Sequence, residues 1–326
     1  MRSIGRLLLA ALVVAVTSLA GVLVAPTGAG AAGPYHEATI QEAGATAFLR
    51  AITLKDATAP PPGVDIPCTP SAAHPYPVVL LHGAGGDRYT NWAYLGPHLA
   101  NAGYCVYALN YGGITPTFVF QGTLVGGFPH AADQINAFID QVLAETHASQ
   151  VDLVGHSEGG LMALYIPKLT DHAPKVHAVV GMGSPTEGST VHGLTTLGDL
   201  FGFTKWLNFF AAHGCGPCAD PPIPGSVITT ELNAGGVAVP GIRYTEIAST
   251  RDELVTPAQN SFIPIAQQPP VEQPLITNVL MQQVCPGETV GHVGEAYDGN
   301  VAQVVLNALD PAHPQPITCG PSGPGY

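Results

Sequence analysis

The sequence predicts an α/β fold with a mostly parallel central sheet and helices on both of its faces. Apolar runs of strand length alternate with helix-competent segments along the chain, and this alternation calls for a parallel sheet covered by helices. The length of 326 residues allows one large domain. Charged residues make up only 10%, beside 39 glycines and 31 prolines, which indicates a compact domain with many turns.

The first residues have the pattern of an export signal. Arg2 and Arg6 form a basic start, Leu7 to Val24 is an apolar core, and Ala29-Gly30-Ala31 offers small residues for cleavage. We therefore expect a signal peptide over 1–31, a secreted protein, and a mature domain over 33–326. The apolar core is also long enough for an uncleaved membrane anchor, which is the alternative interpretation.

Six cysteines in an exported chain indicate three disulfides. Six cysteines permit 15 pairings, so the sequence alone does not fix the connectivity. One favoured bond would join a cysteine just before one predicted strand to a cysteine that opens the next strand. Another would tie the C-terminal tail back to the last strand. The pairings that we favour are Cys68 with Cys105, Cys215 with Cys218, and Cys285 with Cys319.

The spacing of Cys215-Gly-Pro-Cys218 also resembles a redox motif or half of a zinc site. No second cysteine pair accompanies it, and His213 alone does not complete a tetrahedral site. We interpret the segment as a small structural loop and expect no metal.

The elements before residue 150 alternate as a doubly wound sheet requires. Residues 59–77 are rich in proline and form an irregular approach to the sheet. Residues 112–127 mix apolar side chains with glycine and threonine, which fits either a strand pair or part of a pocket wall. The expected strands are Pro77–Leu81 and Cys105–Leu109, and the expected helices are Ala45–Ile52, Asn91–Ala102 and His130–His147.

A glycine-rich turn, His82-Gly83-Ala84-Gly85-Gly86, follows the first of these strands. The spacing is not Gly-x-Gly-x-x-Gly, and no acidic residue ends the next strand, so a dinucleotide site is not indicated. An oxyanion loop fits better. We expect the backbone N–H of Ala84 to act together with that of Glu158.

The stretch Val151-Asp152-Leu153-Val154-Gly155-His156-Ser157-Glu158-Gly159-Gly160 is the centre of the chain. An apolar strand ends in Gly-x-Ser-x-Gly, and a helix-competent segment, Leu161–Ile166, follows at once. This is the pattern of a nucleophile elbow, a sharp turn that presents a serine hydroxyl above a sheet. Gly155 and Gly159 leave room for the turn.

Residues 184–224 interrupt the alternation after a further buried strand, Val176–Met182. The interruption is apolar on nearly every side, which fits either an ordinary core helix or a cap over the serine that supplies an acyl pocket. We favour the cap because of its place between two strands. The expected substrate contacts are Phe201, Trp206, Phe209 and Phe210.

Two late strands are each followed by a residue that could assist the serine. Asp252 comes after Gly241–Ala248, and His292 comes after Asn278–Val284, before a closing helix at Asn300–Leu309. The chain order is Ser, Asp, His, as expected for a catalytic triad on this type of sheet. Glu253 is the main rival of Asp252, because it lies one residue away.

Several short stretches are distributed over most of the chain beyond the export signal: residues 70–75, 78–83, 102–106, the elbow, 243–245, Thr256-Pro257 and 307–311. Their combination is more specific than the elbow alone. Together they resemble the secreted actinobacterial lipases and esterases of the α/β-hydrolase superfamily.

This resemblance implies an α/β-hydrolase fold with Ser157 as nucleophile, Asp252 as acid and His292 as base. Cys68, Cys105, Cys285 and Cys319 also stand where that family has disulfide cysteines. Glu158 and Glu295 depart from the family pattern, and they leave the substrate preference open. From their positions in the site loops, we expect His82 and His156 to shape these loops by hydrogen bonding and not to act as bases.

The chemistry of a Ser–His–Asp set predicts a serine carboxylic ester hydrolase of lipase or esterase type that acts on lipid-like or other apolar acyl esters. The alternatives are a polyester hydrolase or acyltransferase with the same triad, and a catalytically silent binding protein. The net charge of −13 argues against nucleic-acid binding. We expect no cofactor, a small-molecule or lipid ester substrate, transient contact with a lipid interface, and a monomer.

Overall fold

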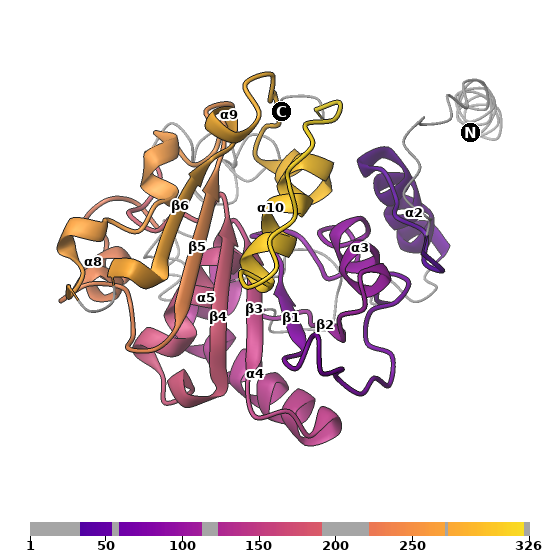
Figure 1. The fold of residues 1–326 in the computed structure, drawn as a ribbon, viewed down its shortest axis with the longest axis horizontal. Coiled ribbons are helices and arrows are strands. Elements are labelled where there is room, and N and C mark those ends of the chain that lie inside the picture. Colours follow the sequence, from indigo (N-terminus) through magenta and orange to yellow (C-terminus); the bar gives the residue numbers. More distant parts are fainter. Residues whose placement is uncertain (1–32, 54–58, 113–122, 191–221, 271–272, 323–326) are drawn as a thin grey trace, which may run out of the picture. The chain divides into compact units, whose positions relative to one another are not determined.

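The fold comes from a computed structural model, which describes residues 33–53, 59–112, 123–190, 222–270 and 273–322 (Figure 1). Several predictions fall outside these residues: the export signal at 1–31, the Cys215–Cys218 loop, most of the cap at 184–224, and its four aromatic side chains. They stay predictions from the sequence.

A six-stranded sheet in the order β2-β1-β3-β4-β5-β6 lies at the centre, and every neighbouring pair of strands is parallel. β3 and β4 occupy the middle of the sheet, and their residues are almost all buried, as the apolar runs of the sequence require. The strands are β1 (Val78–Leu81), β2 (Val106–Ala108), β3 (Val151–His156), β4 (Val176–Met182), β5 (Arg243–Ala248) and β6 (Ile276–Leu280).

Helices follow the strands and connect them across the sheet (Figure 1). The α-helices are α2 (Ile40–Thr53), α3 (Leu95–Asn101), α4 (Thr123–Thr146), α5 (Glu158–Leu169), α8 (Val227–Asn233), α9 (Met281–Val284) and α10 (Gly299–Leu309). Short 3-10 turns are η1 (Ala173–Lys175), η3 (Ala258–Ser261), η4 (Ile265–Gln267), η5 (Gln273–Leu275) and η6 (Val293–Tyr297).

The two faces of the sheet support separate apolar cores, because side chains along a strand alternate between faces. On β1, Val79 and Leu81 pack with α4, α5 and α8, whereas Val78 and Leu80 pack with α3 and α10. Figure 1 shows α10 in front of the sheet and α5 behind it. The predicted three-layer arrangement is thus confirmed, and the carboxyl ends of all six strands meet at one edge.

Two predictions about secondary structure were wrong in part. The last strand ends at Leu280, and Met281–Val284 form the short helix α9 where we expected strand. Residues from Thr123 onward belong to α4, so a strand pair does not extend to Gly127. α4 bends at Gly127, whose φ of +77° and ψ of +167° are not helical, and Pro129 follows it.

Two disulfides join segments that are distant in the sequence. Cys68 is bonded to Cys105 and Cys285 to Cys319, with Cα atoms 5.6 Å apart in each pair. Both agree with the pairings expected from the sequence. The second bond ties the C-terminal tail to the segment directly after α9.

Removing the Cys285–Cys319 bond is expected to destabilise the fold. The bond closes a loop between residues 34 apart, and a cross-link of this span contributes about 2–4 kcal/mol by restricting the unfolded chain. A Cys285→Ala/Cys319→Ala variant should therefore melt several degrees lower in a thermal scan. Reduction of the wild type removes both described bonds and should lower Tm further. A double variant with unchanged Tm would show that this bond does not restrict the unfolded chain.

Candidate active site

The predicted sharp turn is present at Ser157, between β3 and α5. Ser157 has φ of +57° and ψ of −125°, a conformation that is uncommon and strained for a residue other than glycine. Neighbouring glycines make the turn possible. A Cβ added to Gly155 would lie 2.2 Å from the Gly159 carbonyl oxygen, and one on Gly159 would lie 1.9 Å from that of Leu81. Because Ser157 directly follows the last residue of β3, it lies at the carboxyl edge of the sheet.

The structure brings Ser157, His292 and Asp252 together. Asp252 lies in the loop after β5, and His292 directly precedes η6. Ser157 Oγ and His292 Nε2 are 2.8 Å apart, and His292 Nδ1 and Asp252 Oδ2 are 2.7 Å apart. Only 3% of the His292 side chain and 1% of the Asp252 side chain are exposed. The three side chains form one continuous hydrogen-bonded series.

Asp252 and Glu253 make different contacts with His292. The second oxygen of Asp252, Oδ1, accepts the backbone N–H groups of Leu254 and Val255, each at 2.8 Å. These bonds hold the carboxylate so that its other oxygen faces the imidazole. The carboxylate of Glu253 instead accepts the backbone N–H of His292 at 3.2 Å. Glu253 thus holds the histidine's main chain, and Asp252 contacts its ring.

The electrostatic surroundings of His292 favour its protonated form. Burial by itself lowers the pKa of His292, but the negative charge of Asp252, its hydrogen bond to the ring and the charge of Glu253 together raise that pKa above its ordinary value. An imidazole with this raised pKa is a stronger acceptor for the serine proton.

Two further histidines support the site loops. His156 Nε2 lies 2.9 Å from the main-chain oxygen of His292, and its Nδ1 lies 3.1 Å from Asn91 Oδ1. His82 Nδ1 lies 2.9 Å from the main-chain oxygen of Gly83. Burial lowers the pKa of His156 to about 3 and that of His82 to about 4. Both rings are neutral at pH 7, and neither touches the serine hydroxyl through a described hydrogen bond.

The glycine-rich loop 82–86 comes close to the serine. A Cβ on Gly83 would lie 3.0 Å from Ser157 Cβ, so a larger residue there would crowd the serine. Ala84 is half-buried in the same loop, and Glu158 is the first residue of α5, directly after the serine. The backbone N–H groups of Ala84 and Glu158 stay our predicted donors to an oxyanion.

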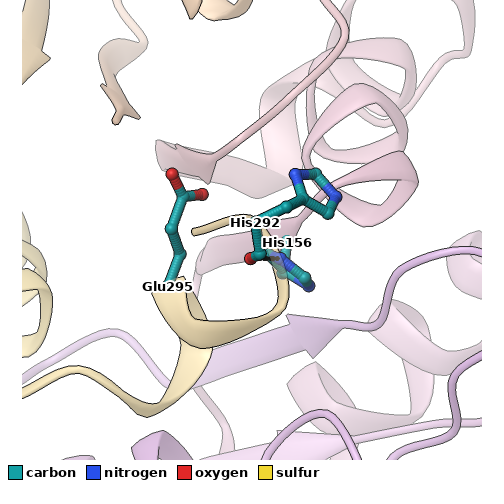
Figure 2. Close-up of side chains that lie close together, drawn as sticks. All are labelled: His156, His292 and Glu295. Atoms are coloured by element: carbon teal, nitrogen blue, oxygen red, sulfur yellow. Dashed lines mark hydrogen bonds between the residues drawn. The ribbon is translucent and has the colours of Figure 1, made fainter. Parts of the chain in front are cut away.

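A buried group of possible metal ligands lies at this site: His156, His292 and Glu295 each offer an atom within 4.8 Å of the others. Figure 2 shows that the three side chains are not directed at a common point. Both ring nitrogens of His292 are already bonded, to Asp252 and to Ser157. A zinc ion needs ligand nitrogens at about 2 Å, so binding here would require the triad to be broken. The arrangement fits proton transfer better than metal binding.

Sequence reasoning missed two residues that shape the site. Asn91 Oδ1 accepts the backbone N–H of Gly83 at 2.9 Å and also contacts His156, and it thereby links the loop after β1 to the end of β3. Gly183, with φ of +55°, follows β4 and faces the His292–Asp252 pair. Both act through contacts between distant segments, so no local pattern marks them. The predicted contact residues Phe201, Trp206, Phe209 and Phe210 lie outside the described residues.

Comparison with known proteins supports the architecture. Residues 76–214 match a family described as alpha/beta hydrolase fold. Triacylglycerol lipases of Pseudarthrobacter phenanthrenivorans and Burkholderia plantarii are each 38% identical to this chain over 124 residues, or 36% of it. The matched segment spans about a third of each relative, 35% and 32%.

A solved structure resembles the chain over a larger share of its length. Aspergillus fumigatus lipase B superposes with a TM-score of 0.51 and 16% identity, over 77% of this chain and 57% of that one. At this identity the likeness concerns the fold. With the all-parallel sheet and the family match, it shows that this chain has the α/β-hydrolase fold.

Proposed function

We propose that the chain is a serine carboxylic ester hydrolase that cleaves apolar acyl esters. The observation that carries this proposal is the series Ser157 Oγ–His292 Nε2 and His292 Nδ1–Asp252 Oδ2, with heavy-atom distances of 2.8 and 2.7 Å. Serine is a weak nucleophile until a base accepts its proton, and this series supplies both the base and the group that orients it. The triacylglycerol lipases among its relatives support an ester as substrate.

The reaction would proceed in two acyl-transfer steps. Ser157 Oγ attacks the ester carbonyl while His292 Nε2 accepts the hydroxyl proton, and Asp252 stabilises the imidazolium that forms. The N–H groups of Ala84 and Glu158 would stabilise the oxyanion. His292 then protonates the departing alcohol. Water, deprotonated by His292, releases the acid from the acyl-enzyme and restores the serine.

An active-site phosphonate and a series of esters test this proposal together. A p-nitrophenyl phosphonate should label Ser157, identified by peptide mass spectrometry, and the unlabelled protein should hydrolyse p-nitrophenyl esters of increasing acyl length. Absence of both labelling and hydrolysis would favour a silent binding protein. Labelling with transfer of the acyl group to an added alcohol, in preference to water, would show an acyltransferase.

The activity should fall on the acid side of neutrality. His292 acts as a base only in its neutral form, and Asp252 and Glu253 raise its pKa above the ordinary 6.5 against the opposing effect of burial. As pH falls through that raised pKa, the neutral fraction and the rate decline together. We expect the acid limb of kcat/KM to have its midpoint above 6.5. A midpoint near 4 would instead indicate a carboxylate as the base.

We also propose that the protein is exported. The two described disulfides support this, because such bonds persist mainly in oxidising compartments. Within the part of the chain that the structure describes, no helix has the length and apolar character needed to cross a membrane. N-terminal sequencing of the secreted protein would locate the cleavage site that we expect near Ala31.

A further inference from the structure

A carboxyl group that the triad does not use lies beside it. Glu295 is in η6, three residues after His292, and only 1% of it is exposed. Neither of its oxygens has a hydrogen bond of standard geometry to a described residue. The backbone of Ser249 interacts with the carboxyl and lowers its pKa, but by less than burial and the carboxylates of Asp252 and Glu253 raise it. A buried carboxyl without a hydrogen bond destabilises a fold even when it is neutral, and far more when it is charged. An apolar side chain would avoid this cost.

Gly183, which has no side chain, leaves the space that this carboxyl occupies. A Cβ on Gly183 would lie 2.6 Å from Glu295 Oε2, 3.0 Å from His292 Nδ1 and 3.1 Å from Asp252 Oδ2. The carboxyl therefore lies next to the two atoms that form the hydrogen bond between His292 and Asp252. An oxygen of Glu295 also lies within 4.8 Å of a ring nitrogen of His292, and Figure 2 shows both side chains rising from the same turn.

The charges around Glu295 oppose its ionisation. Burial is the main cause of a pKa well above the ordinary value, and the carboxylates of Asp252, Glu253 and Asp298 raise that pKa further. The titratable groups that face it also include His292 itself and His156, at the end of β3. His156 is neutral at pH 7, so it adds no positive charge. These surroundings favour the protonated form of Glu295.

We propose that Glu295 is a positioning residue of this site, which acts through the His292–Asp252 pair and places a further negative charge beside the imidazole when it ionises. This inference rests on the proposed ester hydrolysis. On ionisation the carboxylic acid gives its proton to solvent and becomes a carboxylate. The new charge stabilises the imidazolium that forms as Ser157 attacks, so it favours the transition state.

The expected signature is a change of rate with pH. The ratio of wild-type kcat/KM to that of Glu295→Gln should rise with pH across the range in which Glu295 ionises, because glutamine stays neutral. At a separation within 4.8 Å, in surroundings of intermediate effective dielectric constant, a charge of this kind should change the ratio at least about tenfold. The measurement is a pair of pH–rate profiles between about pH 5 and about pH 10. A ratio that is constant with pH would overturn the proposal and leave Glu295 a structural role.

Glu246→Gln is the matched control. Glu246 is a fully buried carboxyl in β5, beside Ser184 and against Gly181, and no described interaction joins it to His292 or Asp252. Burial raises the pKa of Glu246 to about 8, so it too ionises at alkaline pH. We expect a wild-type to Glu246→Gln ratio that does not vary with pH. If this ratio rises like that for Glu295, the effect belongs to the ionisation of any buried acid, and the proposal fails.

Two additions keep the test decisive. Glu295→Met replaces the carboxyl by an apolar chain of similar length, and it should show the same pH-dependent loss if Glu295→Gln does not fold.

The ring signals of His292 can also be followed by NMR without any substrate. In the wild type they should show a second inflection at high pH, which Glu295→Gln should lack. A protein without esterase activity but with this inflection would refute the proposed function alone, whereas a missing inflection refutes the role of Glu295.

Discussion

Replacing Ser157 by alanine is expected to lower kcat for ester hydrolysis at least about 10,000-fold and to leave the melting temperature nearly unchanged. The hydroxyl oxygen of Ser157 would attack the ester. The hydroxyl is hydrogen-bonded to His292 Nε2, the base that would accept its proton. The turn at Ser157 is shaped by the glycines around it, which make close backbone contacts that alanine at position 157 does not alter. Initial rates on a p-nitrophenyl ester and a thermal scan measure the two quantities.

Ser71→Ala provides the comparison for the nucleophile. Ser71 is exposed in the loop before β1, where its hydroxyl accepts the backbone N–H of His74. This variant should keep the wild-type rate. If Ser157→Ala retains more than about a hundredth of the activity, catalysis does not proceed through an acyl-enzyme at this serine.

The fold was predictable because its central strands, β3 and β4, are buried on both faces. The apolar runs at β3 and β4 need no alternation to be recognised, and Gly-x-Ser-x-Gly fixes the point where β3 ends. Prediction failed where the local sequence pattern fits both a strand and a helix. The segment Asn278–Val284 is short and mixes apolar with polar residues, so its periodicity does not distinguish strand from helix. The chain forms α9 from its second half.

The site was predictable as far as its chemistry follows chain order. Ser157, Asp252 and His292 each come after a strand, and parallel strands bring their carboxyl ends to one edge. The supporting contacts lie beyond such reasoning. Asn91 reaches His156 across 65 residues of sequence, and the effect of Glu295 on the triad depends on the space that Gly183 leaves. These relations arise from tertiary packing and have no local signal.

Replacing Asp252 by asparagine is expected to lower kcat about 1,000- to 10,000-fold. The carbonyl of the introduced asparagine could still accept the N–H groups of Leu254 and Val255, which Asp252 Oδ1 accepts at 2.8 Å. The side-chain amide of that asparagine would then face His292 Nδ1 and donate to it. The imidazole would adopt the tautomer with hydrogen on Nε2, and this tautomer cannot accept the serine proton. The backbone geometry, and hence Tm, should change little.

Glu253→Gln is the control that separates the two neighbouring acids. Glu253 accepts only the main-chain N–H of His292 among its described hydrogen bonds, and a glutamine carbonyl can accept the same bond. We expect less than about a tenfold loss.

The acid limb of the pH–rate profile should also differ between the two variants. Asp252→Asn removes the charge and hydrogen bond that raise the pKa of His292 most, so any residual activity should decline at a lower pH. A large loss in Glu253→Gln, with Asp252→Asn close to wild type, would transfer the acid's role to Glu253. The fixed geometry of Asp252 Oδ2, 2.7 Å from the ring, is the reason to expect the opposite result.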